Sequence, residues 1–592
     1  MSVILAAAWL AATPAATPDT LDAITVSASR RAQPVRETLA SVSVIERAQI
    51  DRSQASDLLE LLRREVGLDF ARTGGTGQTT SLFLRGTNSN HLLVLIDGIR
   101  VASSNTGAVA LEHLPLAQIE RIEIVRGPRA SYWGSDAIGG VLAITTRQPE
   151  GPEAALRVGS EGRLGLSAGW GVRQADGHFS LTVGGEDYDG FSAQTPDGFA
   201  YDPDDDGYRR RHLSLHAGRQ LGSQQLSLSV LALRAETEFD QGVSDADQHS
   251  LALSLEGPLG EGWQHRLSLG GNRDDLDTPV FFNRFLSRRQ QLDWVHDVRL
   301  GDSEQLLAGV QLQREKGSSV DTFGQVNQYA EQLDHAAVFT ALQGRNGAFD
   351  HELALRYDDH ERFGGELSSQ LAVGWRFDPG RLYLSFGEGF RAPNLNELYS
   401  PGFGGLFAGN PNLGPESSRS LELGLDTDLA GTALALNIYR TRVNDLIAFE
   451  GGQNFQAVNI AEAAVDGAEL TLSRRFEALS VAANATWQDA RNAATDAELL
   501  RRPRRKLALD LDYDLSANAH VGADLAYVSQ RQDIAGELAS YSLLGLRAET
   551  RLGDDWHLGA RINNALDREY AWAAGFGAPG REWLVTLRWQ AP

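Results

Sequence analysis

The sequence predicts an all-β membrane protein, in which a closed barrel of antiparallel strands follows a smaller N-terminal domain of helices and strands. After about residue 150 the chain breaks into short stretches of alternating apolar and polar residues, each ending in Gly, Asp, Asn or Pro. No run of about 18 apolar residues follows the N-terminal segment, so a chain that crosses a membrane must do so as a closed barrel. Residues 151–592 have room for 22 strands, at about 20 residues per strand and loop.

The N-terminal segment has the features of an export signal. Residues 3–10 are apolar and the residues that follow are rich in Ala, Thr and Pro, although the basic residues that usually precede such a core are missing. We therefore expect residues 1–16 to be a signal peptide and residues 17–29 to be an extended tail.

Residues 30–150 have a mixed pattern, which predicts a small α+β domain. Ser56 and Asp57 are helix-capping residues, and the apolar run that follows them ends at Gly67, so we expect a short helix there. The apolar run from Leu92 to Ile96 predicts a buried strand that enters a turn.

The clearest strand in the second region is residues 507–515. Its odd positions are Leu or Tyr, whereas Asp510, Asp512 and Asp514 occupy even positions, so the two kinds of side chain lie on opposite faces. A soluble β-sandwich or propeller would also alternate. However, no second apolar pattern covers the Leu face, and no self-similar blocks of about 40 residues occur. These facts favour a barrel with lipid outside and carboxylates in its lumen.

Composition excludes several classes of function. The 592 residues carry a net charge of −24, which disfavours nucleic-acid binding, and the absence of Cys removes disulfides, thiolate nucleophiles and zinc–thiolate sites. His residues are scattered singly, and acidic pairs such as Asp358 and Asp359 are more typical of turns than of a glycosidase site. We therefore predict that the protein is not an enzyme.

An ordered set of segments resembles the TonB-dependent outer-membrane receptors. Four of these segments match the plug domain of that family, and they are residues 81–86, 93–98, 119–128 and 132–141. The barrel signature of the family is matched by residues 386–395 and 410–416, and its TonB box is matched by Asp22, Ala23, Ile24, Thr25, Val26, Ser27 and Ala28. The resemblance implies that the 30–150 domain is a plug in the lumen of a 22-stranded transmembrane barrel of residues 151–592. It also implies a multi-pass protein of the Gram-negative outer membrane, in contact with its lipid, that TonB energises together with ExbB and ExbD.

Within that family the sequence is most similar to the cobalamin receptors. Residues 18–20, 74–78, 85–88, 499–502 and 578–582 carry this likeness, which implies import of a corrinoid, delivery to a periplasmic cobalamin-binding protein and a monomeric state. Import of a ferric siderophore or haem stays open, because plug motifs do not identify the cargo. A non-transporting adhesin or signalling receptor is a third alternative, but a signalling receptor should carry a further domain before the box.

The box and two plug loops are the candidate binding elements. Ile24, Thr25 and Val26 favour extended structure, which can add a strand to a partner's sheet edge and bear a pulling force. Gly-rich turns let a backbone approach a ligand, and short uncharged polar groups can orient a corrin and its amide arms. The candidate substrate-binding residues are Gln78, Thr79, Ser81, Asn88, Asn105, Thr106, Arg501 and Phe576.

An acidic run suggests a calcium site. Asp202, Asp204 and Asp206 alternate before a Gly turn, which is a spacing that suits a hard cation needing several oxygen ligands. The run lacks a later Glu, so further ligands would come from the next hairpin, with Asp240 and Asp245 or Asp247 as candidates. The resemblance to cobalamin receptors implies that calcium orders these loops for the cargo; an unpaired acidic surface loop is the alternative.

Overall fold

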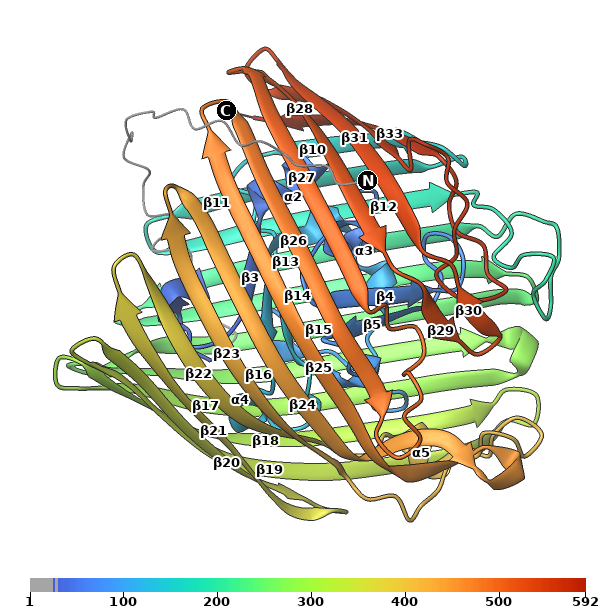
Figure 1. Ribbon diagram of the computed structural model, residues 1–592, viewed down its shortest axis with the longest axis horizontal. Coiled ribbons are helices and arrows are strands. Elements are labelled where there is room, and N and C mark those ends of the chain that lie inside the picture. Colours follow the sequence, from blue (N-terminus) through green and yellow to red (C-terminus); the bar gives the residue numbers. More distant parts are fainter. Residues whose placement is uncertain (1–24, 27–29, 592) are drawn as a thin grey trace, which may run out of the picture.

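The protein folds as one closed barrel with a smaller domain inside it (Figure 1). The computed structural model describes residues 25–26 and 30–591. The expected signal peptide lies outside the described residues, as do Asp22, Ala23, Ile24, Ser27 and Ala28 of the expected box. Among the helices in the described ranges, none is long and apolar enough to cross a membrane.

The barrel confirms the predicted architecture of 22 antiparallel strands. Its strands pair in chain order, and the last pairs with the first through contacts such as Leu156 with Leu587, which closes the cylinder. The strands are β10 (Glu153–Gly159), β11 (Leu164–Gln174), β12 (Gly177–Tyr188), β13 (Tyr208–Leu221), β14 (Gln224–Phe239), β15 (Gly242–Gly260), β16 (Trp263–Thr278), β17 (Asn283–Leu300), β18 (Glu304–Asp321), β19 (Val326–Asn346), β20 (Phe349–His360), β21 (Gly364–Phe377), β22 (Gly380–Arg391), β23 (Glu416–Leu429), β24 (Thr432–Gly451), β25 (Gln456–Phe476), β26 (Leu479–Asn492), β27 (Arg505–Ser516), β28 (Ala519–Val528), β31 (Tyr541–Leu552), β32 (Trp556–Asn563) and β33 (Glu582–Gln590).

The two ends of the barrel differ. Most turns at one end are two or three residues long, and we call this the short-turn end. The other, the long-loop end, carries the loops 189–207, 392–415, 493–504, 529–540 and 564–581. These loops contain the helix α5 (Leu395–Tyr399) and the hairpin of β29 (Arg531–Asp533) and β30 (Gly536–Leu538). Membrane barrels of bacteria place short turns on the periplasmic side and long loops outside.

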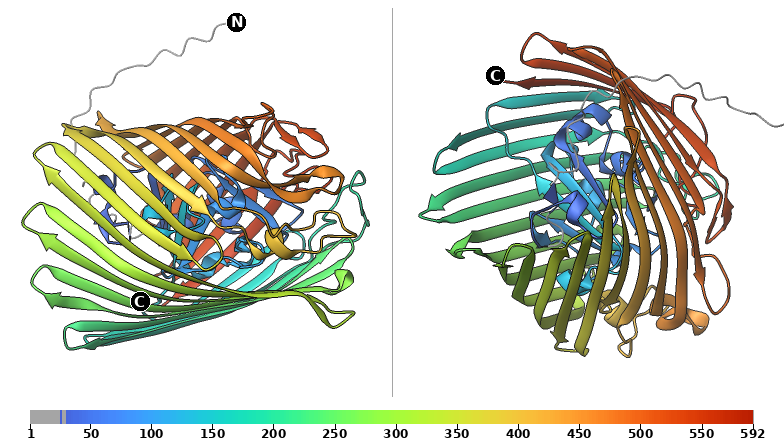
Figure 2. Two further views of the ribbon diagram at one scale, coloured as in Figure 1. Left: turned by 90° about the horizontal axis from the view of Figure 1, so that it is seen from below. Right: turned by 60° about the vertical axis from the view of Figure 1, so that its left-hand side comes forward.

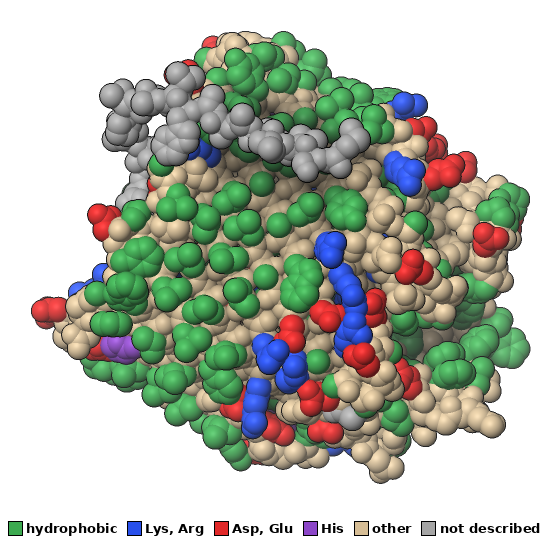
Figure 3. All heavy atoms as spheres, in the orientation of Figure 1, with side chains coloured by type: hydrophobic (Ala, Val, Ile, Leu, Met, Phe, Trp, Pro, Cys, Tyr) green, Lys and Arg blue, Asp and Glu red, His purple; other side chains and the backbone are tan. Residues whose placement is uncertain are grey.

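Side chains alternate along the strands as the sequence predicts. On β27, Leu507 is 52% exposed on the outer surface, whereas Asp510 and Asp512 accept hydrogen bonds from Arg547 inside the wall. Figure 3 shows the resulting outer face, on which hydrophobic side chains cover most of the strands. An apolar outer band is what contact with lipid requires.

The plug lies inside the cylinder, as both views of Figure 2 show. Its main sheet has the order β3-β8-β9-β6-β7, with β6 and β9 parallel, and its core is built from apolar residues such as Leu84, Ile122 and Leu142. The elements are β1 (Thr25–Val26), β2 (Gln33–Pro34), η1 (Val35–Glu37), β3 (Val42–Glu46), α2 (Arg47–Ser53), α3 (Leu58–Leu62), β4 (Leu68–Arg72), β5 (Thr80–Leu84), η2 (Ser89–His91), β6 (Leu92–Ile96), β7 (Ile99–Arg100), η3 (Leu111–His113), η4 (Leu116–Gln118), β8 (Ile119–Arg126), α4 (Ala130–Trp133) and β9 (Gly140–Thr146).

Both local predictions for the plug hold. The predicted strand is β6, with all five residues buried, because it lies inside a mixed sheet that is covered on both faces. The predicted helix is α3, and Asp57 caps it by accepting a hydrogen bond from the Glu60 amide at 2.8 Å. The first barrel strand begins seven residues after the last plug strand ends at Thr146.

Charged pairs join the plug to the barrel wall. Arg85 of the plug contacts Glu422 and Glu469 of the wall, and Arg30 contacts Asp293, with all of these side chains buried. Buried ion pairs of this kind give little net stability over apolar packing. The plug is therefore seated by these directional polar contacts together with apolar packing, because wall residues such as Leu231 and Phe339 belong to the same buried apolar clusters as plug residues.

Candidate functional site

The first candidate substrate loop, residues 74–79, lies under the long loop 189–207. The Cα of Gly74 is packed against Ala193, and Gly77 has φ of +84° with its Cα against the Tyr208 ring. A Cβ at Gly77 would come within 2.1 Å of that ring, so only Gly fits at this position. The plug loop and the barrel loop are thus in direct contact at the long-loop end.

Gln78 connects the plug loop to the next barrel hairpin. Its Nε2 donates to the backbone oxygen of Glu238 at 2.5 Å, and its side chain is buried. Thr79, by contrast, is exposed, and Ser81 is half-buried within β5. Of these three candidates, Thr79 offers the most surface to a ligand in this conformation, while Gln78 holds the loop in place.

Two of the predicted calcium ligands, Asp206 and Asp240, lie together beside that contact. Asp206 is buried and accepts a hydrogen bond from the Ala193 amide at 2.6 Å. Asp240 accepts one from the Asp202 amide at 3.0 Å, and its Oδ2 is buried without a hydrogen-bond partner. Burial, together with the nearby carboxylates of Asp240 and Asp204, raises the pKa of Asp206 to about 6. A bound cation would give the Asp240 Oδ2 a partner, and it would also reduce the repulsion between these carboxylates.

In this conformation the acidic residues provide only part of the oxygen ligands that a calcium ion requires. Across residues 25–26 and 30–591, no three His, Cys, Asp or Glu side chains are gathered in a way that could hold a metal ion. Asp202 and Asp204 lie on the exposed part of the loop, so their carboxylates would have to close onto Asp206 and Asp240. Asp245 is not brought together with them. It belongs to the outward-facing register of β15, opposite Glu236, because strand residues alternate between faces.

Sequence analysis did not single out Glu238. Its carboxylate accepts a hydrogen bond from the Gly207 amide at 2.9 Å and contributes to the raised pKa of Asp206. Glu238 lies two residues before Asp240, near the end of strand β14. This closeness in sequence could have identified it as a further oxygen ligand. It is a further oxygen donor close to the acidic run.

The second plug contact involves Asn88 and the loop 493–504. Arg502 donates to the Asn88 Oδ1 at 2.7 Å, and its guanidinium lies 3.9 Å from the centre of the Phe83 ring. Burial lowers the pKa of Arg502 to about 9. The predicted residue Arg501 points elsewhere and donates to Asp533 at 2.8 Å. Arg502, which the sequence did not distinguish from its neighbour, is therefore the residue that bridges plug and barrel here.

The second plug loop, which carries Asn105 and Thr106, is fixed by the barrel wall. Asn105 has no exposed surface, since its Nδ2 donates to the Leu286 oxygen and its Oδ1 accepts from the Tyr329 hydroxyl, both at 3.0 Å. The backbone oxygen of Thr106 accepts from Asn394. In this conformation Asn105 positions the loop and presents no group to a ligand, whereas Thr106 is partly exposed.

Phe576 lies in an aromatic pair at the rim. Its ring meets that of Phe199, with the centroids 6.4 Å apart in an edge arrangement, and Phe199 is 82% exposed. Two long loops, 189–207 and 564–581, therefore present one aromatic surface at the long-loop end. Such a surface can cover the apolar face of a large ligand.

The loop that carries Phe576 also contacts the plug. Trp572 packs against Phe70 with the ring centroids 5.5 Å apart, and the Arg72 guanidinium lies 5.3 Å from the Trp572 ring. Arg72 in turn pairs with Asp57 at 2.8 Å, which is the cap of α3. The rim loop is thereby connected to the plug helix α3 through the side chains of Trp572, Arg72 and Asp57. Trp572 and Arg72 also line a small cavity between plug and wall.

The segment expected to bind TonB is at the opposite end. Thr25 and Val26 form β1, which pairs with β2. Arg31, a few residues later, contacts Asp297, and Asp297 lies three residues before β17 ends in a short turn. The chain therefore enters the barrel from the short-turn side, which is the periplasmic side in bacterial barrels.

Comparison with known proteins agrees with this geometry. A family model described as "TonB dependent receptor-like, beta-barrel" matches residues 132–565, and one described as "TonB-dependent Receptor Plug Domain" matches residues 34–141. The chain belongs to the TonB-dependent receptor family. This is a family of outer-membrane transporters and receptors rather than enzymes, so the chain is a TonB-dependent transporter of a small molecule across the Gram-negative outer membrane.

Individual relatives of this TonB-dependent receptor carry two kinds of name. The chain is 30% identical to the "Vitamin B12 transporter BtuB" of Vibrio vulnificus, with 96% of each chain covered. It is 29% identical to the protein of the same name from Photobacterium profundum, covering 96% of this chain and 95% of that one. Among solved structures, a mutant ferric enterobactin receptor (PfeA) from Pseudomonas aeruginosa superimposes with a TM-score of 0.80 at 19% identity, covering 96% of this chain and all of that one. That last likeness concerns the fold alone.

Proposed function

We propose that this receptor imports cobalamin or a related corrinoid. The observation that carries the proposal is the similarity to vitamin B12 transporters at 29–30% identity along nearly the whole chain, which includes the loops as well as the strands. The rim supports it in chemical terms, because Phe199 and Phe576 give an apolar surface and Thr79 and Thr106 give uncharged hydrogen-bonding groups.

Transport would follow from the two-ended arrangement. Cargo binds at the long-loop end, while TonB takes up residues 22–28 at the short-turn end and pulls. A strand added to a partner's sheet edge transmits force along main-chain hydrogen bonds. The pull would have to release polar plug–wall contacts such as the one between Arg85 and Glu469, and the vacated lumen then becomes hydrated and lets the cargo pass. A periplasmic binding protein would accept the corrinoid.

We propose in addition that calcium orders the rim. Asp206 and Asp240 would hold the ion, with oxygens of Asp202 and Asp204 closing onto it from the exposed run. Calcium supplies a positive charge with several oxygen ligands and no redox chemistry. Because Gln78 bonds to Glu238 and Gly74 packs against Ala193, an ordered acidic loop would also fix the first plug loop.

Import of a ferric siderophore is the second candidate. The high structural similarity to a ferric enterobactin receptor favours it at the level of the fold. The acidic rim disfavours an anionic ferric complex, because the carboxylates of Asp204, Asp206 and Asp240 would repel it unless a cation neutralised them. The charge of the rim therefore favours an uncharged cargo over an anionic ferric complex.

An uptake assay tests the proposal. The full chain is produced in a Gram-negative host that lacks its own cobalamin receptor, and cell-associated radiolabelled cyanocobalamin is followed over time. We expect uptake that requires TonB, and we expect Ile24→Pro to abolish uptake while leaving surface binding intact, because Pro cannot donate to a strand ladder. Ile24→Val is the matched control and should transport normally. If the barrel is assembled in the outer membrane but cells show neither binding nor uptake of cyanocobalamin, the corrinoid proposal is refuted.

A further inference from the structure

The middle of the wall strands β11, β12 and β13 presents small or uncharged residues to the lumen. These residues pair across the three strands, with Gly169 opposite Thr182 and Thr182 opposite Ser214. We call this set the polar seam, and its members are Gly165, Ser167, Gly169, Gly171, Ser180, Thr182, Gly184, His212 and Ser214. The polar seam contains no carboxylate, Lys or Arg.

Four neighbouring side chains of the polar seam are buried without hydrogen-bond partners. They are the hydroxyls of Ser180, Thr182 and Ser214, together with both ring nitrogens of His212. Each of these residues is at most 8% exposed. A buried polar group without a partner loses the hydrogen bonds that it would make in water. The polar seam would therefore be stabilised by contact with water or with an uncharged ligand that donates and accepts hydrogen bonds.

The polar seam lies between a candidate substrate loop and the periplasmic side. Toward the long-loop end it borders Glu186, which pairs with Arg163. Arg163 also donates to the hydroxyl of Thr76, in the first candidate substrate loop, at 2.7 Å. Toward the short-turn end, a Cβ at Gly171 would lie 1.8 Å from the backbone oxygen of Pro149. The segment that links the plug to the barrel therefore runs beside the lower end of the polar seam.

Ion pairs hold the plug to other parts of the wall. Plug residues 30–146 form ion pairs with β17, β19, β20, β23, β25, β27, β28, β32 and β33. Within the described part of the chain, no ion pair joins residues 30–146 to β11–β16. The contacts near the polar seam are neutral, such as that between the Thr146 hydroxyl and His216 Nε2 at 2.8 Å. Separation of the plug from β11–β13 therefore breaks no ion pair on that side.

We propose that the plug parts from the wall at the polar seam and that the cargo crosses the barrel along it; the second half of this inference rests on the proposed import of a corrinoid. Opening there gives water or cargo access to the unpartnered groups, and the glycines add no side chains that would narrow the gap. The amide arms of a corrinoid can exchange hydrogen bonds with uncharged hydroxyls along the way. The plug would shift toward the opposite wall, so the directional ion pairs there, such as that of Arg85 with Glu469, must yield to the pull.

Thiol labelling of the purified full chain tests where the plug parts from the wall. The chain has no Cys, so Ser214→Cys places a single thiol in the polar seam and Ser368→Cys places a matched thiol on β21. Both serines are 1% exposed, and both hydroxyls lack a hydrogen-bond partner. In urea below the unfolding transition of the barrel, we expect a maleimide to label Ser214→Cys about tenfold faster than Ser368→Cys, because local opening exposes the first thiol. Thr182→Cys is a second variant in the polar seam and should behave as Ser214→Cys does. Equal rates on the two walls, or faster labelling of Ser368→Cys, would overturn the proposal.

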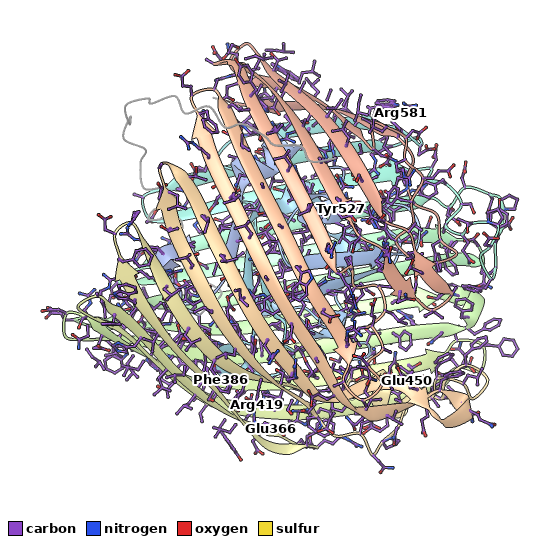
Figure 4. The ribbon with its side chains drawn as sticks, viewed as in Figure 1. Glu366, Phe386, Arg419, Glu450, Tyr527 and Arg581 are labelled. Atoms are coloured by element: carbon purple, nitrogen blue, oxygen red, sulfur yellow. The ribbon has the colours of Figure 1, made fainter. Side chains whose placement is uncertain are left out.

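Labelling in cells tests the passage of the cargo. The variants are produced in a Gram-negative host that lacks its own cobalamin receptor, and a maleimide that does not cross lipid is added with cyanocobalamin. We expect TonB and cyanocobalamin together to accelerate labelling of Ser214→Cys by about tenfold or more, and that of Ser368→Cys by less than about twofold. Arg419→Cys controls for access of the reagent and should label at a constant rate, because Arg419, marked in Figure 4, is on the outer face of β23 with its side chain 72% exposed.

The adduct at Ser214→Cys should also obstruct transport. We expect cyanocobalamin uptake to fall by about tenfold while surface binding is retained, because the adduct fills the route and leaves the rim unchanged. Uptake without accelerated labelling of Ser214→Cys, or normal uptake by the labelled protein, would overturn the route. If the unlabelled protein binds no cyanocobalamin, the corrinoid proposal fails instead, and the urea experiment still decides where the plug parts from the wall.

Discussion

The plug residue Arg85 lies 2.8 Å from Glu469 of the barrel wall, and both side chains are buried. The same guanidinium reaches Glu422 at 2.7 Å, so one plug cation neutralises two wall carboxylates. The Tyr439 ring lies 4.3 Å from the guanidinium and covers it. This arrangement fixes the plug in rotation and depth.

Replacement of Arg85 by Gln should loosen the plug. Two buried carboxylates would then face each other without a counter-charge, and a broken buried pair costs about 3–5 kcal/mol. We expect the urea midpoint of plug unfolding to fall, measured by hydrogen exchange of the β6 and β9 amides, while the barrel transition stays in place. Arg419→Gln is the control, because its exposed pair with Glu388 is worth about 1 kcal/mol or less. Equal exchange in both variants would contradict this assignment.

Removal of calcium should weaken cargo binding. If the ion orders loop 189–207 and through it the plug loop at Gln78, EDTA should lower the affinity for cyanocobalamin by about tenfold or more, and added calcium should restore it. Asp240→Asn should mimic EDTA because it removes the ligand whose Oδ2 has no protein partner. Asp197→Asn, on the exposed part of the same loop, should behave as wild type. Binding that is indifferent to EDTA would exclude the calcium proposal.

Calcium affinity should depend on pH near 6. Burial and neighbouring carboxylates raise the pKa of Asp206 to about 6, above its ordinary value, so this group is protonated in the calcium-free protein below that pH. Its deprotonation therefore costs the calcium-free loop stability as pH rises from about 4 to 6, and calcium offsets that cost above pH 6. We expect calcium affinity, measured by titration calorimetry, to fall about fivefold between pH 6 and pH 5, because the deprotonated fraction of Asp206 falls by that factor. A flat profile over this range would show that Asp206 is not a ligand.

The aromatic pair at the rim should contribute to cargo affinity. Phe576→Ala removes one ring of the pair with Phe199, and an aromatic contact is worth about 0.5–1.5 kcal/mol beyond its buried area, so we expect the dissociation constant for cyanocobalamin to rise by about three- to tenfold. Phe576→Tyr keeps the ring and should retain affinity. Trp263→Ala, at the short-turn end, is the control and should leave binding unchanged. Full affinity in Phe576→Ala would remove this residue from the site.

Local patterns predicted the fold well. Residues 507–515 showed the alternation that places Leu outside and Asp inside, and residues 92–96 showed the uninterrupted apolar run of a buried strand. Both patterns arise from contacts along one strand. The strand count followed from the length of chain divided by the length of a strand and its loop, since each barrel strand must cross the same membrane.

Side-chain partners from distant parts of the chain were harder to predict. Arg501 and Arg502 look alike in the sequence, but only Arg502 reaches the plug, because the backbone turns between them and Arg501 has φ of +64°. Asn105 looked like an exposed loop residue, yet it is buried by Tyr329 and Leu286, more than 180 residues away. Asp245 shared a hairpin with Asp240 but alternation turned it to the outer face.

Direct binding of cyanocobalamin to the purified full chain, in detergent with calcium, tests the central claim. Titration calorimetry should show saturable one-to-one binding at micromolar or lower concentration, and ferric enterobactin at the same concentration should neither bind nor compete. No binding at micromolar cyanocobalamin, or binding of the ferric siderophore in its place, would contradict the account.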